Sequence, residues 1–303
     1  VIRLLKFNYI YFFIGFNMAT GSNVRTFFEG TWHSQDKYVM RAADHGSWLG
    51  SSVFDGARYV DGVAPDLKAH CDRVNHSAEA MMITPTISSE KMVDIIMDGI
   101  KKYNSNQAIY IRPMYWAIEG GDLAIVPKKG VTGFAICLED IPMADPNLAA
   151  TLTTTSFRRP VLEDNVVNAK AGCLYPNNAR MLAEARKKGF SNALVADIMG
   201  NVAETATANI FIVKNGEVFT PIPNGTFLAG ITRNRHISNL KADGYKVHEK
   251  VISFNDVSEA DEVFMSGNMM KVTPVNAFND TNYQIGPITK KTRDLYWDWA
   301  KSE

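Results

Sequence analysis

The sequence lacks the features that mark several specialised classes of protein. Its 303 residues include only three cysteines, Cys71, Cys137 and Cys173, and no two of them form a CxxC pair. This spacing argues against a disulfide framework or a zinc site and is typical of a reducing compartment, so we expect a cytoplasmic protein. Lys plus Arg number 32, as do Asp plus Glu, so no net charge attracts nucleic acid or an anionic membrane.

The common catalytic motifs are also absent. The chain contains no G-x-S-x-G elbow, no G-x-x-x-x-G-K-[ST] loop, no H-E-x-x-H and no G-x-G-x-x-G. Its six histidines have no metal-ligand spacing, so we expect no metal. Hydrolase, nucleotide-binding and zinc-enzyme functions therefore lose support.

The length predicts two domains, because a typical domain has roughly 150 residues. Residues 141–150, IPMADPNLAA, contain two prolines and no clear periodicity, so we expect an interdomain linker there. The linker separates a predicted N-terminal domain at 18–140 from a predicted C-terminal domain at 151–303.

The first 17 residues have a different character. Arg3 and Lys6 precede a short apolar run that is too short to span a bilayer, and Met18 follows. We expect residues 1–17 to be upstream sequence translated from an early start. A removed signal peptide is the alternative, although no A-x-A cleavage site is present.

Local patterns predict an α+β class with helices segregated from two sheets. Hydrophobic spacing predicts a helix at 89–103, and Asn215-Gly216 predicts a type I′ hairpin turn. Thr232 is a plausible N-cap for the helix predicted at 233–240. The other expected elements are strands at 108–113, 194–196, 209–214, 217–220 and 263–265, and a helix at 176–188 that Gly189 ends.

One lysine stands out by its surroundings. Lys170 lies among small and apolar residues in NAKAGCLY, at 168–175. A solvated surface lysine is the ordinary interpretation. The alternative is a desolvated lysine that loses its proton and attacks a carbonyl, as Schiff-base chemistry requires.

Two further features combine with this lysine. Glu204 is the one charged residue in NVAETATANIF, at 201–211, where an exposed loop carboxylate competes with one that faces a cationic heteroatom. Gly230-Ile231-Thr232 precedes a helix, whose amino end is a ready phosphate site. An amine, a carboxylate for a protonated pyridine nitrogen and a phosphate site together predict pyridoxal 5′-phosphate (PLP).

The sequence resembles the fold-type IV PLP-dependent aminotransferases, and within them the branched-chain amino acid aminotransferases. The resemblance covers nearly everything after Met18. The matching motifs are SVFDGAR at 52–58, HCDR at 70–73, YIRP at 110–113, NAKAG at 168–172, LAGITR at 228–233, ADEVFMSG at 260–267 and TPV at 273–275. The resemblance implies a two-domain α+β fold with PLP bound by the C-terminal domain.

The resemblance also implies a role for each cofactor-binding residue. Lys170 would bind PLP covalently and move the proton between the substrate carbon and the cofactor. Glu204 would keep the pyridine nitrogen protonated, and Tyr175 would bind the ring oxygen.

The phosphate and substrate sides follow in the same way. Arg73 would clamp the phosphate, with the backbone of Ile231 and Thr232 and the Thr232 hydroxyl completing the cup. Asn268 stands where the family usually has a phosphate-binding threonine. The residues expected on the substrate side are Phe54, Tyr110, Arg112, Met269 and Met270, the two methionines replacing a usual pair of alanines.

The resemblance implies ping-pong transamination, in which an apolar, branched-chain L-amino acid donates its amino group to 2-oxoglutarate. Arg112 beside Tyr110 favours this over the D-amino acid and (R)-amine transaminases of the same fold. An aminodeoxychorismate lyase-like enzyme and a PLP-binding protein without activity are further alternatives. Because a neighbouring subunit closes the active site in this family, and Trp48 to Phe54 is apolar, we expect a homodimer.

Overall fold

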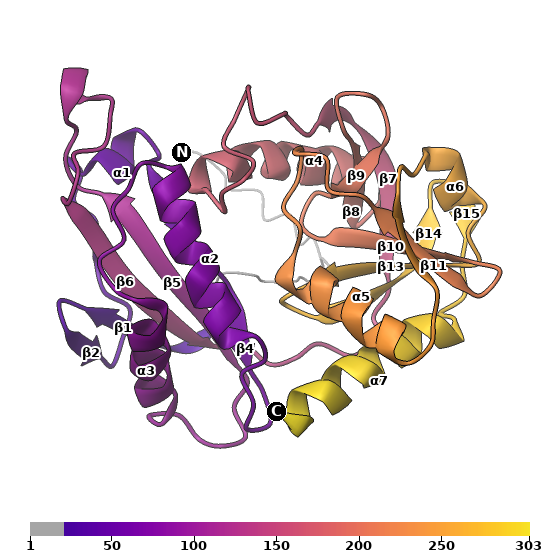
Figure 1. Ribbon diagram of the computed structural model, residues 1–303, viewed down its shortest axis with the longest axis horizontal. Helices are drawn as coiled ribbons and strands as arrows, with labels where there is room; N and C mark the ends of the chain where they lie inside the picture. Colours follow the sequence, from indigo (N-terminus) through magenta and orange to yellow (C-terminus); the bar gives the residue numbers. More distant parts are fainter. Residues whose placement is uncertain (1–20) are drawn as a thin grey trace, which may run out of the picture.

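Two β-sheets organise the chain, one in each of two lobes that lie side by side (Figure 1). The computed structural model describes residues 21–303, so the extension predicted at 1–17 lies outside the described residues. Along the chain, β6 (Thr132–Asp140) is the last strand that joins the first sheet, and β7 (Ala150–Arg158) is the first that joins the second. Residues 141–149 between them therefore connect the lobes. Most strand pairs are antiparallel and the helices lie outside the sheets, which confirms the α+β class.

Within the described residues, the first sheet has six strands in the order β2-β1-β6-β5-β3, with β4 also paired to β5. Its other strands are β1 (Ser22–Phe28), β2 (Thr31–His33), β3 (Ser52–Phe54), β4 (Ala57–Tyr59) and β5 (Ile109–Ala117). Helices α2 (Leu67–Ala80) and α3 (Ser89–Ile100) cover one face, as Figure 1 shows. The short helical turn α1 (His45–Trp48) contacts β5, and the turn η1 (Asp122–Ala124) lies in the connection between β5 and β6.

The second sheet, as far as residues 21–303 form it, has nine strands in the order β12-β11-β10-β13-β14-β7-β8-β9, with β15 paired to β14. Its remaining strands are β8 (Asn192–Ala196), β9 (Val202–Thr205), β10 (Asn209–Lys214), β11 (Glu217–Pro221), β12 (Val247–Lys250), β13 (Glu262–Gly267), β14 (Lys271–Phe278) and β15 (Thr281–Asn282). The sheet curls, since β9 at one end of this path also contacts β10.

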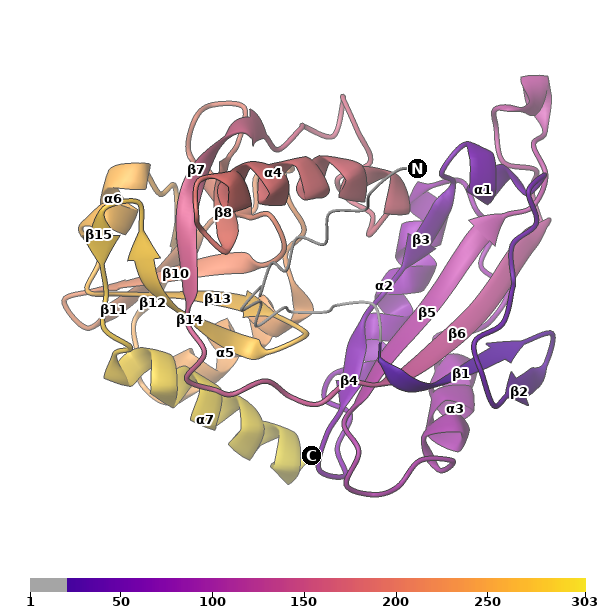
Figure 2. The ribbon, with the colours of Figure 1, turned by 180° about the vertical axis from the view of Figure 1, so that it is seen from behind.

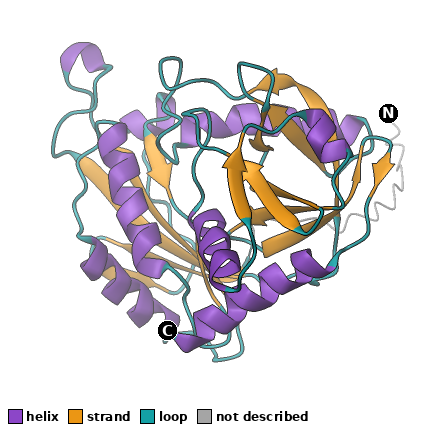
Figure 3. Cartoon of the chain, turned by 45° about the vertical axis from the view of Figure 1, so that its right-hand side comes forward, coloured by secondary structure: helices purple, strands orange, loops and turns teal. Residues whose placement is uncertain are grey.

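Four helices and a short turn accompany the second sheet. Helix α4 (Tyr175–Lys187), preceded by the turn η2 (Gly172–Leu174), packs on β7 and β8 and extends toward the first lobe (Figure 2). Helices α5 (Ile231–Ala242) and α7 (Pro287–Ser302) pack on each other and on β13. Figure 3 shows α7, which ends at the C-terminus, running below the strands, and α6 (Phe254–Ser258) is the remaining helix. Among residues 21–303, no helix is long and apolar enough to cross a membrane.

The structure corrects two details of the sequence analysis. Strand β5 does not end at Pro113 but continues to Ala117, because Pro113 lies where β3 and β4 separate and its missing N–H leaves no ladder bond unmade. Thr232 is not the N-cap of α5, because Gly230 occupies that position with extended backbone and Thr232 is already helical. The hairpin turn forms as predicted, with positive φ of 51° at Asn215 and 76° at Gly216.

A segment of the second half of the chain is held against the first lobe. Ala171 forms an isolated β-bridge with Val53, and the Phe54 N–H donates to the Lys170 carbonyl at 3.1 Å. The Lys170 N–H donates in turn to the Ser77 hydroxyl of α2 at 3.0 Å. An ion pair of 2.6 Å between Arg235 and Asp66 also joins α5 to the start of α2. These contacts determine how the lobes face each other.

Candidate active site

A cavity of about 1280 Å³ has walls from both lobes. The twelve residues that the sequence analysis proposed for cofactor and substrate all line it. They are Phe54, Arg73, Tyr110, Arg112, Lys170, Tyr175, Glu204, Ile231, Thr232, Asn268, Met269 and Met270. Tertiary folding therefore brings together residues spread over more than 200 positions of the chain.

Lys170 is half-buried and lines this cavity. Its ammonium Nζ donates to the Tyr175 hydroxyl at 2.7 Å. The same atom lies 4.9 Å from the centre of the Phe54 ring. The lysine is thus held between a hydroxyl and an aromatic face, where a bound carbonyl compound can reach it.

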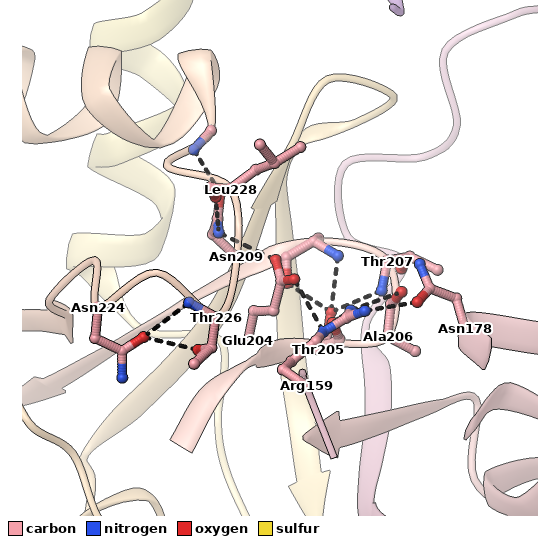
Figure 4. Close-up of polar contacts among 12 residues, drawn as sticks. Arg159, Asn178, Glu204, Thr205, Ala206, Thr207, Asn209, Asn224, Thr226 and Leu228 are labelled. Atoms are coloured by element: carbon pink, nitrogen blue, oxygen red, sulfur yellow. Dashed lines mark hydrogen bonds and ion pairs between the residues drawn. The ribbon is translucent and has the colours of Figure 1, made fainter. Parts of the chain in front are cut away.

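Glu204, on β9, is a half-buried carboxylate that lines the cavity. Its Oε1 lies 3.0 Å from the Arg159 Nε, and its Oε2 accepts from the Asn209 amide at 3.2 Å (Figure 4). Burial raises the pKa of Glu204 above its ordinary value, although the charges of Arg159 and Lys170 oppose this effect. A cationic partner in the cavity would therefore stabilise its charged form.

Arg159 is a buried residue that the sequence analysis missed. Figure 4 shows its guanidinium surrounded by acceptors: the Asn178 side chain at 2.6 Å and the Thr205 carbonyl at 2.8 Å. Together with the Glu204 contact, these bonds fix the position of both charges. No local pattern relates Arg159 to Glu204, because only the pairing of β7, β8 and β9 places them together.

The amino end of α5 forms another part of the wall. Its N-cap Gly230 has no side chain to cap the helix, so within residues 21–303 the first N–H groups, including those of Ile231 and Thr232, remain available to bind an anion. The Gly230 N–H donates to Asn209 Oδ1 at 3.1 Å, and a Cβ on Gly230 would lie only 2.3 Å from that oxygen. Asn209 thus links the helix end to Glu204.

Arg73, on α2, faces the cavity from the first lobe. Its Nε and Nη2 donate to the two carboxylate oxygens of Asp55 at 2.6 and 2.8 Å. No described residue bonds its Nη1, which is therefore available for a ligand. His70 Nδ1 lies 2.7 Å from Asp55 as well. Burial alone would raise the pKa of Asp55, but Arg73 and His70 hold it well below the ordinary value. Asp55 therefore stays charged and orients Arg73.

The rest of the predicted substrate side is mainly apolar. Met269 and Met270 contribute thioether side chains, and Arg112 lies with its guanidinium carbon 5.7 Å from the centre of the Tyr110 ring. Asn268 is instead a residue expected on the phosphate side. Its Oδ1 accepts from the buried Lys271 at 2.6 Å. Its Nδ2 has no hydrogen-bond partner among residues 21–303, so this amide retains one donor for a ligand.

Comparison with known proteins agrees with this arrangement. Residues 52–278 match the profile of the family described as amino-transferase class IV. The chain belongs to the class IV aminotransferases. The branched-chain-amino-acid aminotransferase of Salmonella typhimurium is 30% identical over 281 residues, covering 88% of each chain.

Solved structures extend the similarity to the fold. An aminotransferase from Brucella abortus bound to PLP is 52% identical, with a TM-score of 0.90 over 92% of this chain and 99% of that one. The branched-chain amino acid aminotransferase of T.th., complexed with N-(5′-phosphopyridoxyl)-L-glutamate, is 26% identical, with a TM-score of 0.83 over 92% and 94% of the two chains. The predicted fold type and cofactor, PLP, are confirmed.

The residues present suit this cofactor. PLP needs an amine for its aldehyde, a cation-binding carboxylate for its ring nitrogen and donors for its phosphate. Lys170 would supply the amine and Glu204 the carboxylate. The amino end of α5 would supply the donors for the phosphate. The backbone at this end lies so close to Asn209 that a Cβ on Gly230 would collide with its side chain.

We expect Gly230→Ala to weaken PLP binding. The added methyl group must displace Asn209 or the start of α5, so phosphate donors are lost and the dissociation constant should rise roughly tenfold. Titration of the apoenzyme with PLP, followed by fluorescence, measures it. Ala229→Ser at the neighbouring exposed position should leave affinity unchanged, and equal affinities in the two variants would contradict the assignment.

Proposed function

We propose that this aminotransferase transfers the amino group of a branched-chain or similar apolar L-amino acid to 2-oxoglutarate by a ping-pong mechanism. The supporting observation is the composition of one cavity. The Lys170 amine, Glu204 and the open α5 end line one part, and apolar side chains beside a cavity-facing arginine, Arg112, line another.

The residues on the substrate side of the cavity can bind two kinds of substrate side chain, aliphatic and carboxylate. Phe54, Met269 and Met270 offer apolar contact to a branched aliphatic group. Arg112 offers a guanidinium, which binds carboxylates well, to the second carboxylate of 2-oxoglutarate or glutamate. The glutamate adduct in the solved structure of the T.th. enzyme is consistent with a dicarboxylic partner.

Bound PLP would supply the electron sink that lets the amino acid lose its Cα proton. Lys170, facing the cavity, is the group we assign to take that proton and return it to the cofactor. The Tyr175 hydroxyl, 2.7 Å from its Nζ, holds the amine in place. Glu204, fixed by Arg159 and Asn209, keeps a negative charge ready for the ring nitrogen. Arg73 and the α5 end bind the phosphate.

A panel of amino donors tests the proposal. With 2-oxoglutarate as acceptor, the purified holoenzyme should form glutamate fastest from L-leucine, L-isoleucine or L-valine, because the cavity combines apolar contacts with Arg112. D-Amino acids and (R)-amines are scored in the same assay. Preference for either of those donors would assign the chain to another branch of the fold.

Lys170→Ala is the matched control for this panel. It should bind PLP yet show no turnover, since the proton-transfer amine is gone. Borohydride reduction of the wild-type holoenzyme should attach the cofactor to Lys170, as peptide mass spectrometry would show. A label on another lysine would refute the assignment.

Glu204→Gln should retain PLP but lower kcat on the order of 100-fold. A neutral amide cannot stabilise a protonated ring nitrogen, so the electron sink is weakened. Stopped-flow measurement of the half-reaction separates this step from binding. A kcat near that of the wild type would remove Glu204 from the mechanism.

We also propose a homodimer, supported by an exposed apolar patch beside α1. Trp48 is 59% exposed and Leu123 95% exposed, and the His45 side chain hydrogen-bonds the Ile125 carbonyl at 3.0 Å, which joins α1 to the 122–126 loop. Such patches mark protein interfaces. Val53, in the apolar segment predicted from sequence, is instead fully buried in the core.

Sedimentation at low micromolar concentration should give twice the mass of one chain. Leu123→Glu should shift the distribution toward monomer, because it places a charge in the patch. Tyr38→Glu, at a fully exposed aromatic residue, is the control and should stay dimeric. A wild-type protein that is monomeric and fully active would disprove the dimer.

A further inference from the structure

Arg112 has a buried, charged partner, Glu139, on the neighbouring strand. On the neighbouring strand β6, Cys137 pairs with Arg112 and Glu139 pairs with Tyr110. Because side chains alternate along a strand, Tyr110, Arg112, Cys137 and Glu139 project from the same face. Arg112 lines the cavity, whereas Glu139 is 2% exposed and is not one of the lining residues.

The Glu139 carboxylate is held firmly in that position. Its Oε1 accepts a hydrogen bond from Arg112 Nη2 and lies 3.5 Å from the Cys137 sulfur. Its Oε2 accepts from the Gly21 N–H at 2.9 Å. Arg112 makes two hydrogen bonds to described residues, one to Cys137 and one to Glu139, and its Nη2 donates both. Among residues 21–303, nothing bonds its Nε or Nη1, so these atoms are available for a ligand.

The other two side chains beside Arg112 on this face are neutral. Burial raises the pKa of Cys137 to about 12, and burial also raises the pKa of Tyr110 well above its ordinary value. Within residues 21–303, Glu139 is therefore the one negative side chain that bonds Arg112. The pair carries no net charge toward the cavity.

We propose that Glu139 is a specificity-determining residue that balances this site between apolar and dicarboxylic substrates. This inference rests on the proposed function, in which one site must accept both in alternation. An aliphatic side chain placed against an unpaired guanidinium would leave a charge desolvated, and Glu139 removes that penalty. A second substrate carboxylate gains from Arg112 but is repelled by Glu139, so the pair moderates its affinity.

Glu139→Gln tests the proposal, because it removes the charge and keeps the shape and one acceptor. Calorimetry on the holoenzyme measures binding of two unreactive analogues, glutarate for the dicarboxylic substrate and 4-methylvalerate for the apolar one. We expect glutarate to bind on the order of tenfold tighter and 4-methylvalerate severalfold weaker than in wild type. The KM values of 2-oxoglutarate and L-leucine should move in the same opposite directions.

Asp140→Asn is the matched control. It removes the same charge from the next residue of β6, whose carboxylate bonds Gln107 rather than Arg112, and should change neither affinity. In an Arg112→Gln background, Glu139→Gln should also have no effect, because the charge it balances is absent. Thermal unfolding of each variant verifies that it is folded.

Two results would overturn the proposal. One is equal analogue affinities in Glu139→Gln and wild type. The other is a loss of glutarate affinity, which would mean that Glu139 merely orients Arg112. If wild type neither binds glutarate nor uses 2-oxoglutarate, the acceptor in the proposed function is wrong. Glutarate binding that then emerges in Glu139→Gln would still support the role of Glu139, and its continued absence would refute it.

Discussion

Pairing with a buried partner of opposite charge holds in place three of the charged side chains that face the cavity. Asp55 binds Arg73, Arg159 binds Glu204 and Glu139 binds Arg112. A charge at a partly dehydrated surface is costly unless it is paired, so these partners make it possible for the cavity to hold fixed charges before a ligand arrives. Preorganised charge of this kind is what catalysis by electrostatic complementarity requires.

A second link connects the two parts of the site on the larger sheet. The Asn209 amide donates to Glu204 and accepts from the Gly230 N–H. One buried side chain therefore fixes both the carboxylate that we propose for the ring nitrogen and the helix end that we propose for the phosphate. Because the distance between these two features has to match one cofactor, a rigid connection suits the task better than two independent loops.

Local patterns carried much of the information about elements and cofactor. The Asn215-Gly216 turn formed as expected because both residues tolerate positive φ, and helix α3 followed its hydrophobic spacing to Ile100. Local reasoning failed at Pro113, where the missing ladder bond depends on how β3 and β4 pair with β5. It also failed at Gly230, since a helix N-cap without a side chain leaves no polar signature.

The sequence by itself determined three chemical groups that line the cavity. These are an amine in a small-residue run at Lys170, a carboxylate at Glu204 and a glycine turn before α5. Only the tertiary structure decided which side chains form ion pairs with the charged residues of the site. Arg159 and Glu139 lie in ordinary-looking segments, and their partners are 45 and 27 residues away in the sequence. Strand pairing, which no local pattern encodes, places those charges within bonding distance, because register and sheet order arise from packing of the whole chain.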